Sequence, residues 1–360
     1  KCSVEIGKDI SAEALEADFD VILLAAGATI KRNLPIPGSE LNGVVQAMDF
    51  LPHNNKAVDG QLERELKYLA TDRNVVVIGG GHAGCEASLA SARMGIKTAL
   101  ITSTISSIGL TPCNPSIGGP AKGIVVREID AIGGEMGINS DKTMLQIKML
   151  NRSKGPAVHS LRAQVDKVEY PLAMQKTISE TDNLDVVESM VEGLIVEDHI
   201  IKGVKLEDGK TIFADKVVIT TGTYMDSYII KGEEKISSGP DDLPTNKTLS
   251  KSIEELGIEM FRLKTGTPPR VLKDSIDFSK AELSEGDKEK LAFSFYDPKY
   301  LDKEKEVDCY LIHTNAETHK IINDNLGKSA MYSGVIEGVG PRYCPSIEDK
   351  LFRFKDKERH

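Results

Sequence analysis

The sequence predicts an α/β fold whose first complete unit binds a dinucleotide. Three observations carry this prediction. A β-branched run at 75–78 leads directly into glycines at 79, 81 and 84, a helical pattern follows at 83–94, and a second apolar strand pattern occupies 97–102. A strand, a glycine-rich turn, a helix and a second strand in this order form the βαβ unit of dinucleotide-binding domains.

The three glycines of this pattern have distinct physical tasks. Gly79 permits the tight turn, Gly81 lets the backbone approach a pyrophosphate, and Gly84 lets the helix pack close to the strand. The N–H groups at the helix start favour an anion. Such folds often place an acidic residue about 20 residues after the first glycine to hold the ribose, but residues 99–104 read Ala-Leu-Ile-Thr-Ser-Thr. We therefore expect a different ribose contact.

Further elements follow from apolar patterns and turn residues. We expect a helix at 124–132, a hairpin turn at 207–209, an exposed charged stretch at 273–307, and strands at 186–188, 193–196, 201–206, 216–221 and 307–314. A strand and Gly-Ala-Thr turn at 19–29 is similar to the strand and Gly-Thr turn at 216–223, yet only one glycine fingerprint is present. This pairing indicates two joined pieces, of which residues 1–74 are too short for an independent α/β domain.

The composition is that of an ordinary soluble protein of two or three domains. The chain has 360 residues, of which 40% are hydrophobic and 28% charged. Its net charge of −10 argues against a protein that wraps nucleic acid over its whole surface, but leaves a local basic face open. No apolar run reaches the roughly 18 residues of a membrane span, and no signal-peptide core is present. The chain lacks an initiator Met and reads as a segment of a longer frame.

The cysteines indicate the compartment. There are five, and none forms a CxxC pair. A sparse, odd set argues against a disulfide framework and against a zinc site, so we expect no metal site and favour the reducing cytoplasm.

Several long motifs point to one family. They are Gly79-Gly-Gly-His-Ala-Gly-Cys-Glu-Ala, Cys113-Asn-Pro-Ser-Ile-Gly-Gly-Pro-Ala-Lys-Gly, Asn151-Arg-Ser-Lys-Gly-Pro-Ala-Val, Leu161-Arg-Ala-Gln, Lys264-Thr-Gly-Thr-Pro-Pro-Arg and Gly340-Pro-Arg-Tyr-Cys-Pro-Ser-Ile-Glu-Asp-Lys. In this order they resemble the MnmG/GidA family of tRNA-modifying enzymes over about residues 75–360. The resemblance implies a FAD-binding Rossmann-like domain of the glutathione reductase type at 75–265, and an incomplete inserted NAD-binding-like α/β domain at 266–360.

Residues 1–74 resemble a different family. The segment 19–29, Leu34-Pro-Ile-Pro-Gly and Ala47-Met-Asp-Phe-Leu are similar to the small (beta) subunit of NADPH-dependent glutamate synthase. That family also has a Val-Val-Ile-Gly-Gly-Gly turn, so we interpret the chain as a chimera joined at this shared motif, with an extra N-terminal partial flavoprotein fragment. It would lack the start of one protein and the second half of the other, and we expect weak FAD binding and poor or no tRNA modification.

The main resemblance implies addition of a carboxymethylaminomethyl or aminomethyl group to C5 of the wobble uridine in certain tRNAs. It implies a homodimer that works with an MnmE-type GTPase, with methylenetetrahydrofolate as one-carbon donor, FAD for the redox step and NADH to reduce the flavin. Two alternatives stay open. Residues 1–74 favour a glutamate-synthase-type NADPH:acceptor oxidoreductase, and the missing second half favours a non-catalytic FAD-binding fragment. Residues 82–87, His-Ala-Gly-Cys-Glu-Ala, favour the tRNA-modifying family.

The resemblance also assigns roles to residues. Cys113 and Cys344 match the catalytic pair, in which a thiolate attacks C6 of uracil to activate C5; which of them attacks stays open. The implied FAD contacts are Gly79, Gly80, Gly81, His82, Ala83, Gly84 and Val191, and the strand and turn at 216–223 add Gly222 and Thr223. The implied NADH contacts are Gly340, Pro341, Arg342, Tyr343, Pro345, Ser346, Ile347, Glu348, Asp349 and Lys350.

Single residues near these motifs have simpler interpretations. Cys113 precedes a helix start, whose positive end favours a thiolate. We expect Cys85 to pack inside the first helix, His82 to position backbone, and His159 to be a satisfied loop histidine. Asn246 stands where the family often has Ser, and its role stays open. A basic face for tRNA phosphates would draw on Lys122, Arg127, Lys154, Arg162 and Arg270.

Overall fold

The computed structural model describes residues 73–232, 234–264, 266–295, 306–330, 332–334, 336 and 346–359. Contacts divide the chain into two units, Lys1–Leu69 and Ala70–His360, and every element below lies in the second unit. The expectations for residues 1–72, including the strand and turn at 19–29, lie outside the described residues. So do the site predictions for Gly340, Pro341, Arg342, Tyr343, Cys344 and Pro345.

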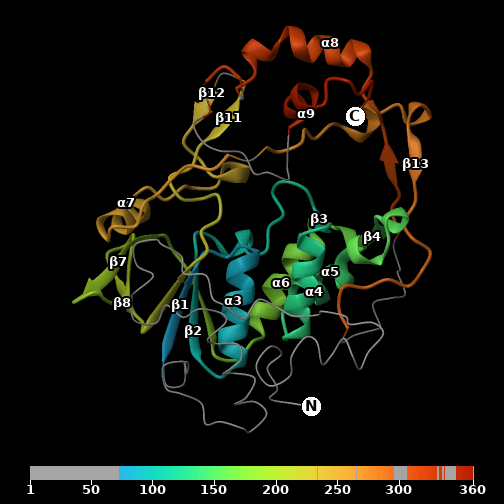
Figure 1. Cartoon of the computed structure of the whole chain (residues 1–360). Helices are drawn as coiled ribbons and strands as arrows, with labels where there is room; N and C mark the ends of the chain where they lie inside the picture. The colour runs from blue at the N-terminus through green and yellow to red at the C-terminus, as the bar shows by residue number, and fades with distance from the viewer. Residues whose placement is uncertain are drawn as a thin grey trace, which may run out of the picture. The chain divides into compact units, whose positions relative to one another are not determined.

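A four-stranded parallel sheet organises the second unit (Figure 1). In spatial order its strands are β10 (Lys216–Ile219), β1 (Asn74–Ile78), β2 (Lys97–Thr102) and β6 (Leu184–Glu188). In β1, Val77 lies opposite Leu100 of β2 on one side and Val218 of β10 on the other. The glycine turn therefore leaves the sheet between two parallel neighbours at their carboxyl ends, where ligands of open α/β sheets bind.

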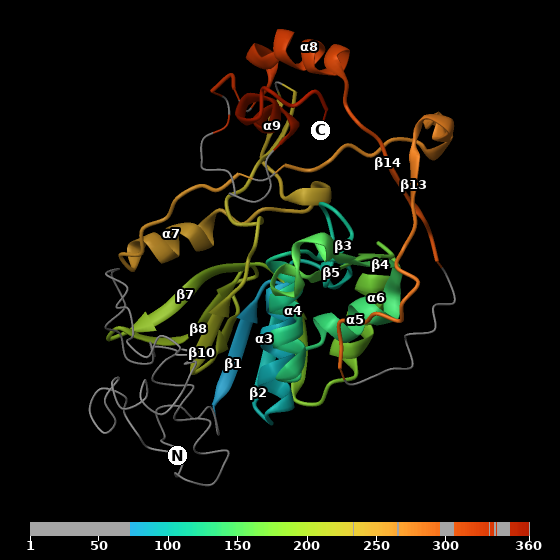
Figure 2. The same cartoon turned by 45° about the vertical axis from the view of Figure 1, so that its right-hand side comes forward.

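The residues of β1 serve two cores, because successive side chains of a strand point to opposite faces. Val75 and Val77 pack with helices α3 (His82–Arg93) and α6 (Glu169–Ser179). Val76 and Ile78 pack on the other face with the antiparallel strands and helix β7 (Val191–Glu197), β8 (Ile200–Leu206), β9 (Thr211–Phe213) and α7 (Thr248–Glu255). Figure 2 shows α3 on one side of β1 and the strands β7 and β8 on the other.

A second antiparallel sheet has its own core. It consists of β3 (Ser116–Gly118), β5 (Ser160–Val165) and β4 (Met144–Leu150), and it packs with α4 (Lys122–Ala131) and α5 (Met136–Thr143). Ile117, Ile147 and Leu161 from the three strands are almost fully buried there. This sheet carries the segment around Cys113.

The remaining elements are short. They are the antiparallel pairs β11 (Ile229–Lys231) with β12 (Glu234–Ile236) and β13 (Glu282–Ser284) with β14 (Cys309–Leu311), and the helices α8 (Ala316–Asp324) and α9 (Ile347–Arg353). The 3₁₀ turns are η2 (Ile105–Ser107), η3 (Arg152–Lys154), η4 (Pro156–Val158), η5 (Pro240–Asp242), η6 (Lys273–Ser275), η7 (Phe278–Lys280) and η9 (Leu326–Lys328).

The elements predicted between 75 and 102 are confirmed, each within one residue at either end. The predicted hairpin turn at 207–209 joins β8 to β9, the helix predicted at 124–132 begins earlier, at Lys122, and the strand predicted at 307–314 is limited to β14. The expected exposure of 273–307 is wrong for Phe293, which is 0% exposed in the core of the second sheet. Because the surrounding stretch is rich in charged residues, its composition did not indicate that Phe293 is buried.

Within the described residues, no helix combines the length and the apolar character that crossing a membrane requires. The same part of the chain contains no group of His, Cys, Asp and Glu side chains that could hold a metal ion.

Candidate functional site

The turn between β1 and α3 has glycine where the geometry demands it. Gly79 has a φ of +104°, and a Cβ there would lie 2.6 Å from the carbonyl oxygen of Thr220. A Cβ on Gly84 would lie 1.8 Å from the carbonyl oxygen of Gly79. A Cβ on Gly81 would meet no protein atom within 4 Å. Gly79 and Gly84 therefore serve the turn itself, whereas Gly81 leaves open space beside the backbone.

Helix α3 begins at this turn without a side-chain cap. Its N-cap is Gly81, and its first turn contains no acidic residue. The first N–H groups of a helix have no partner within the helix and carry partial positive charge. The turn is therefore ready to bind an anion such as a pyrophosphate.

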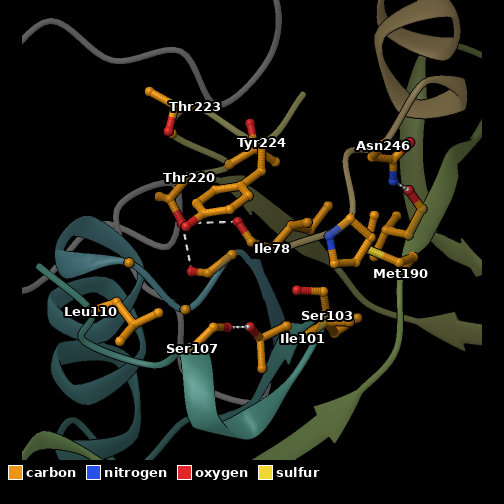
Figure 3. A pocket seen from close by; sticks show the side chains of 18 of the residues that line it. Ile78, Ile101, Ser103, Ser107, Leu110, Met190, Thr220, Thr223, Tyr224 and Asn246 are labelled. Atoms are coloured by element: carbon orange, nitrogen blue, oxygen red, sulfur yellow. Dashed lines mark hydrogen bonds between the residues drawn. The ribbon is translucent and has the colours of Figure 1, made fainter. Parts of the chain in front are cut away.

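A cavity of about 300 Å³ opens along the carboxyl ends of β1 and β2 (Figure 3). It brings together segments that are distant in the sequence: the glycine turn, the end of β2 with the loop after it, the start of β7, the turn after β10 and the residues around the start of α7. Of the predicted FAD contacts it is lined by Gly79, Gly80, Gly81, His82, Ala83, Val191, Gly222 and Thr223. Gly84 lies behind Gly79 instead, where it allows close packing. The individual contact assignments stay predictions.

Thr220 holds the glycine turn in place, and sequence reasoning missed it. Its Oγ1 lies 2.9 Å from the carbonyl oxygen of Ile78 and 3.1 Å from that of Gly79, and it donates to them (Figure 3). The signal available in the sequence is the Thr-Thr pair directly before the predicted Gly222-Thr223 turn.

Asn246, whose role the sequence left open, connects the cavity wall to α7. Its Nδ2 donates to the carbonyl oxygen of Val191. Its Oδ1 accepts from the backbone N–H groups of Thr248 and Leu249, at 3.0 and 2.9 Å, which is the way asparagine caps a helix start. One buried side chain thus positions both β7 and α7 at the cavity.

Hydroxyl groups lie where an acidic residue is often found in such folds. Thr102 ends β2, and its Oγ1 is 3.2 Å from Oγ of Ser107. Ser103 and Ser107 both line the cavity. Because hydroxyls both donate and accept hydrogen bonds, these two serines are the candidates for the different ribose contact that the sequence predicts.

His82 is a neutral imidazole at neutral pH. Burial, reinforced by the positive charge of Lys122, lowers its pKa to about 4. Its ring stacks on Tyr170 with 5.5 Å between the ring centroids, and its Nε2 has no hydrogen-bond partner among the described residues. A histidine that stays uncharged at neutral pH fits the predicted positioning role better than acid catalysis.

A second cavity, of about 330 Å³, surrounds Cys113. Its lining comes from the Cys113 segment, the turn into α4, and the facing strands, namely Cys113, Asn114, Ser116, Gly118, Gly119, Pro120, Lys122, Leu150 and Arg162. Pro112, the residue before Cys113, lines the first cavity. The two cavities therefore adjoin at this point of the chain.

The Lys264–Arg270 loop contacts the half-buried Cys113. The thiol Sγ lies 3.5 Å from the carbonyl oxygen of Gly266. Arg270 donates from Nη2 to the carbonyl oxygen of Cys113 at 3.3 Å. Two motifs that the sequence analysis singled out separately thus meet at one thiol.

Comparison with known proteins decides the family. A family model described as Glucose inhibited division protein A matches residues 74–360. The chain belongs to the GidA family. A second model, described as Pyridine nucleotide-disulphide oxidoreductase, matches residues 1–119. The predicted family and the α/β fold class of the FAD-binding type are confirmed, while the likeness of residues 1–74 to glutamate synthase and the chimera stay predictions.

Curated relatives and a solved structure cover the same region. The tRNA uridine 5-carboxymethylaminomethyl modification enzyme MnmG of Bacillus mycoides (strain KBAB4) is 55% identical over 293 residues, or 81% of this chain and 46% of the relative. The enzyme of that name from Geobacillus thermodenitrificans (strain NG80-2) is 56% identical over 295 residues, or 82% and 47%. Aquifex aeolicus GidA in its form I crystal matches with a TM-score of 0.75 and 46% identity, over 80% of this chain and 49% of that one. The chain spans about half the length of the curated relatives it matches.

The five basic residues predicted to face tRNA lie in different surroundings in this GidA-family chain. Lys122 and Arg162 line the Cys113 cavity, and Arg270 contacts Cys113. Arg127 instead donates to the carbonyl oxygen of Ala292 and lies 4.0 Å above the ring of Phe295, so its guanidinium serves packing. Lys154 lies in η3 and is not part of either cavity lining.

Cys85 and His159 behave as predicted. Cys85 is fully buried in α3, its Sγ donates to the carbonyl oxygen of Gly80 at 3.4 Å, and burial raises its pKa to about 12. Nε2 of His159 lies 3.3 Å from the carbonyl oxygen of Arg152. Neither residue lines either of the two cavities.

The described part of the predicted NADH segment begins helix α9. Ser346 is its N-cap and accepts from the N–H of Asp349 at 3.2 Å. The Asp349 carboxylate accepts from the Tyr332 hydroxyl at 3.1 Å and pairs with Lys264 at 3.8 Å. Ser346 and Asp349 thus each have a partner within the protein, and the NADH assignment stays a prediction.

Proposed function

We propose that this chain forms the FAD-binding part of an enzyme that modifies C5 of the wobble uridine in tRNA. The observation that carries the proposal is the adjacency of the two cavities: one is ready for a dinucleotide, and the other is lined by a half-buried thiol and two basic side chains. Family membership and the activity named for the curated relatives support it. A redox cofactor beside a nucleophilic thiol suits the chemistry of a uridine ring.

The first cavity fits FAD through features of its own residues. The uncapped start of α3 offers N–H groups to the pyrophosphate, and the open space beside Gly81 lets it approach the backbone. Ser103 and Ser107 offer hydroxyls to the ribose, and Val191 offers an apolar contact to the adenine. When bound, FAD supplies electron transfer that side chains cannot perform.

Cys113 is proposed as one of two thiols in the reaction, and Cys344 as the other. A thiolate donates its electron pair to C6 of uracil, and the C5–C6 π pair moves toward C5, which becomes a nucleophilic, enolate-like carbon. The second thiol would hold or move the proton at C5. Which cysteine has which role stays open.

The other requirements belong to the same proposal. NADH would reduce the flavin, methylenetetrahydrofolate would supply the carbon, and an MnmE-type GTPase would be the partner of a homodimeric enzyme. The long motif resemblance supports these assignments. The sparse cysteines without a CxxC pair support a cytoplasmic location.

Two glycine substitutions test FAD binding. Gly81→Ala adds a methyl group to open space, so the free energy of unfolding without FAD should change by less than about 1 kcal/mol, while FAD affinity falls about tenfold or more because the methyl group takes the space beside the phosphates. Gly79→Ala, at φ +104° and against Thr220, should lower the free energy of unfolding. Flavin fluorescence quenching and urea denaturation measure these quantities. Unchanged FAD affinity in Gly81→Ala would contradict the assignment.

The modification reaction is tested with Cys113→Ser. The chain is supplied with FAD, NADH, methylenetetrahydrofolate, the GTPase partner and tRNA that lacks the modification, and modified uridine is measured by mass spectrometry of digested tRNA. We expect Cys113→Ser to lose modified uridine and to keep FAD binding. Cys309→Ser, which removes another half-buried thiol, is the matched control and should keep both. Normal modification by Cys113→Ser would refute the assigned role.

A further inference from the structure

The Cys113 cavity carries positive charge that its described lining does not neutralise. Lys122 and Arg162 line it, and none of its described lining residues is acidic. The ammonium group of Lys122 makes no hydrogen bond or ion pair with any side chain or backbone atom that the structure describes. Two cations in a cavity without an acidic lining residue favour a ligand that brings a negative charge.

Neighbouring elements position these two cations. Arg162 lies on β5, and its Nε donates to Oγ of Ser116 on β3 at 2.8 Å, which leaves its Nη groups for another acceptor. Lys122 is the first residue of α4, whose N-terminus has no side-chain cap and no acidic residue in its first turn. The helix end therefore adds its partial positive charge to the two side chains.

The charges lie close enough to influence one another. Burial lowers the pKa of Lys122, a Cys113 thiolate raises it, and Arg162 lowers it. Lys122 in turn helps to lower the pKa of His82 in the glycine turn. A bound anion would relieve the repulsion between Lys122 and Arg162 next to both the thiol and the dinucleotide cavity.

We propose that Lys122 and Arg162 bind the carboxylate of the amine that becomes part of the modified uridine, an inference that rests on the proposed function. The carboxymethylaminomethyl group in the name of the curated relatives ends in a carboxylate, and its amine part has the structure of glycine. In an aminomethyl group the amine part corresponds to ammonia, which has no carboxylate. Because a guanidinium binds a carboxylate in a bidentate way, this pair selects a carboxylated amine over ammonia.

Alkylation of Cys113 tests the anion site without any tRNA chemistry. Iodoacetate is negatively charged and iodoacetamide is neutral, but both react with the same thiolate, so the ratio of their rates cancels changes in the thiolate fraction. We expect Lys122→Met to lower the iodoacetate-to-iodoacetamide rate ratio at Cys113 about 5- to 10-fold, read by peptide mass spectrometry. Lys176→Met, which removes an exposed charge on α6, should leave the ratio unchanged. An unchanged ratio in Lys122→Met overturns the proposal.

Added ligands distinguish a carboxylate from a phosphate, which would bring the same charge. Glycine should slow iodoacetate alkylation of Cys113 in the unmodified sequence and not in Lys122→Met. Ammonium chloride and inorganic phosphate at the same ionic strength should slow it no more than sodium chloride does. Protection by phosphate that equals or exceeds protection by glycine overturns the carboxylate assignment in favour of a tRNA backbone contact.

The products of tRNA modification give the third measurement. With glycine and ammonium both present, Lys122→Met and Arg162→Gln should shift the products from carboxymethylaminomethyluridine toward aminomethyluridine, because selection is a difference between two affinities. A loss of both products in equal proportion contradicts carboxylate selection. If the unmodified sequence forms neither product, the proposed function fails together with the amine assignment, while the alkylation ratio still reports the anion site.

Discussion

At the residue scale, His82 makes a prediction about pH. Its pKa of about 4 in the folded protein lies below the ordinary value of 6.5. Between these values the unfolded chain binds more protons than the folded one, so the free energy of unfolding decreases as pH falls from 6.5 toward 4. His82→Gln removes this titration, and the decrease should be smaller in the variant. Urea denaturation between pH 4.5 and 7 measures it.

A second buried group, Asp141, changes the free energy of unfolding with pH in the opposite direction, so the effect of His82 must be measured as a difference between two proteins. Burial raises the pKa of Asp141 to about 6 from 3.8, so its contribution to stability is lost as pH rises through this window. The difference between His82→Gln and the unmodified sequence at each pH isolates the histidine, because Asp141 is present in both. Parallel curves for the two proteins would show that His82 is not buried as a neutral ring.

Sequence reasoning at this scale succeeded where a residue acts on its own neighbours. The roles of Gly79 and Gly84 in the turn follow from a local spacing that only one kind of turn satisfies. Thr220 and Asn246 act on backbone atoms that are distant in the sequence, and the residues next to them do not reveal which distant atoms they bind. The cavity could therefore be predicted at its glycine turn but not at the side chains that fix its walls.

At the element scale, α5 depends on a carboxylate from α3. Glu86 accepts from the backbone N–H groups of Glu135, at 3.1 Å, and Met136, at 2.6 Å, and burial raises its pKa. Glu86→Ala leaves these donors without their acceptor, so the free energy of unfolding should fall by about 2 kcal/mol. Glu86→Gln keeps a carbonyl acceptor and should cost less. Urea denaturation compares them, and equal losses would show that the N–H contacts contribute little.

At the scale of the whole molecule, the boundary predicted at residue 265 rested on a change in composition. The structure shows contacts across it. Asp287 accepts from the N–H of Met149 in β4 at 2.8 Å, and Asp141 of α5 accepts from the N–H groups of Phe293 and Ser294 at 2.8 Å each. A charged composition indicates that most side chains of a segment are exposed to solvent. It does not reveal which few residues pack against another element, so these contacts could not be predicted from the sequence.

Phe293 and Phe295 provide a matched test of that anchoring. Phe293 is 0% exposed in the core of the second sheet, and Phe295 is 64% exposed beneath Arg127. Phe293→Ala should lower the free energy of unfolding by about 3 to 4 kcal/mol because it leaves a cavity. Phe295→Ala, which loses a cation–π contact, should lower it by about 1 kcal/mol or less. Hydrogen exchange should also accelerate in β4 and β5 of Phe293→Ala. Unchanged hydrogen exchange in β4 and β5 would show that residues after 265 fold independently of the sheet beside Cys113. If the two parts share one core, removing the Phe293 ring must destabilise these strands as well.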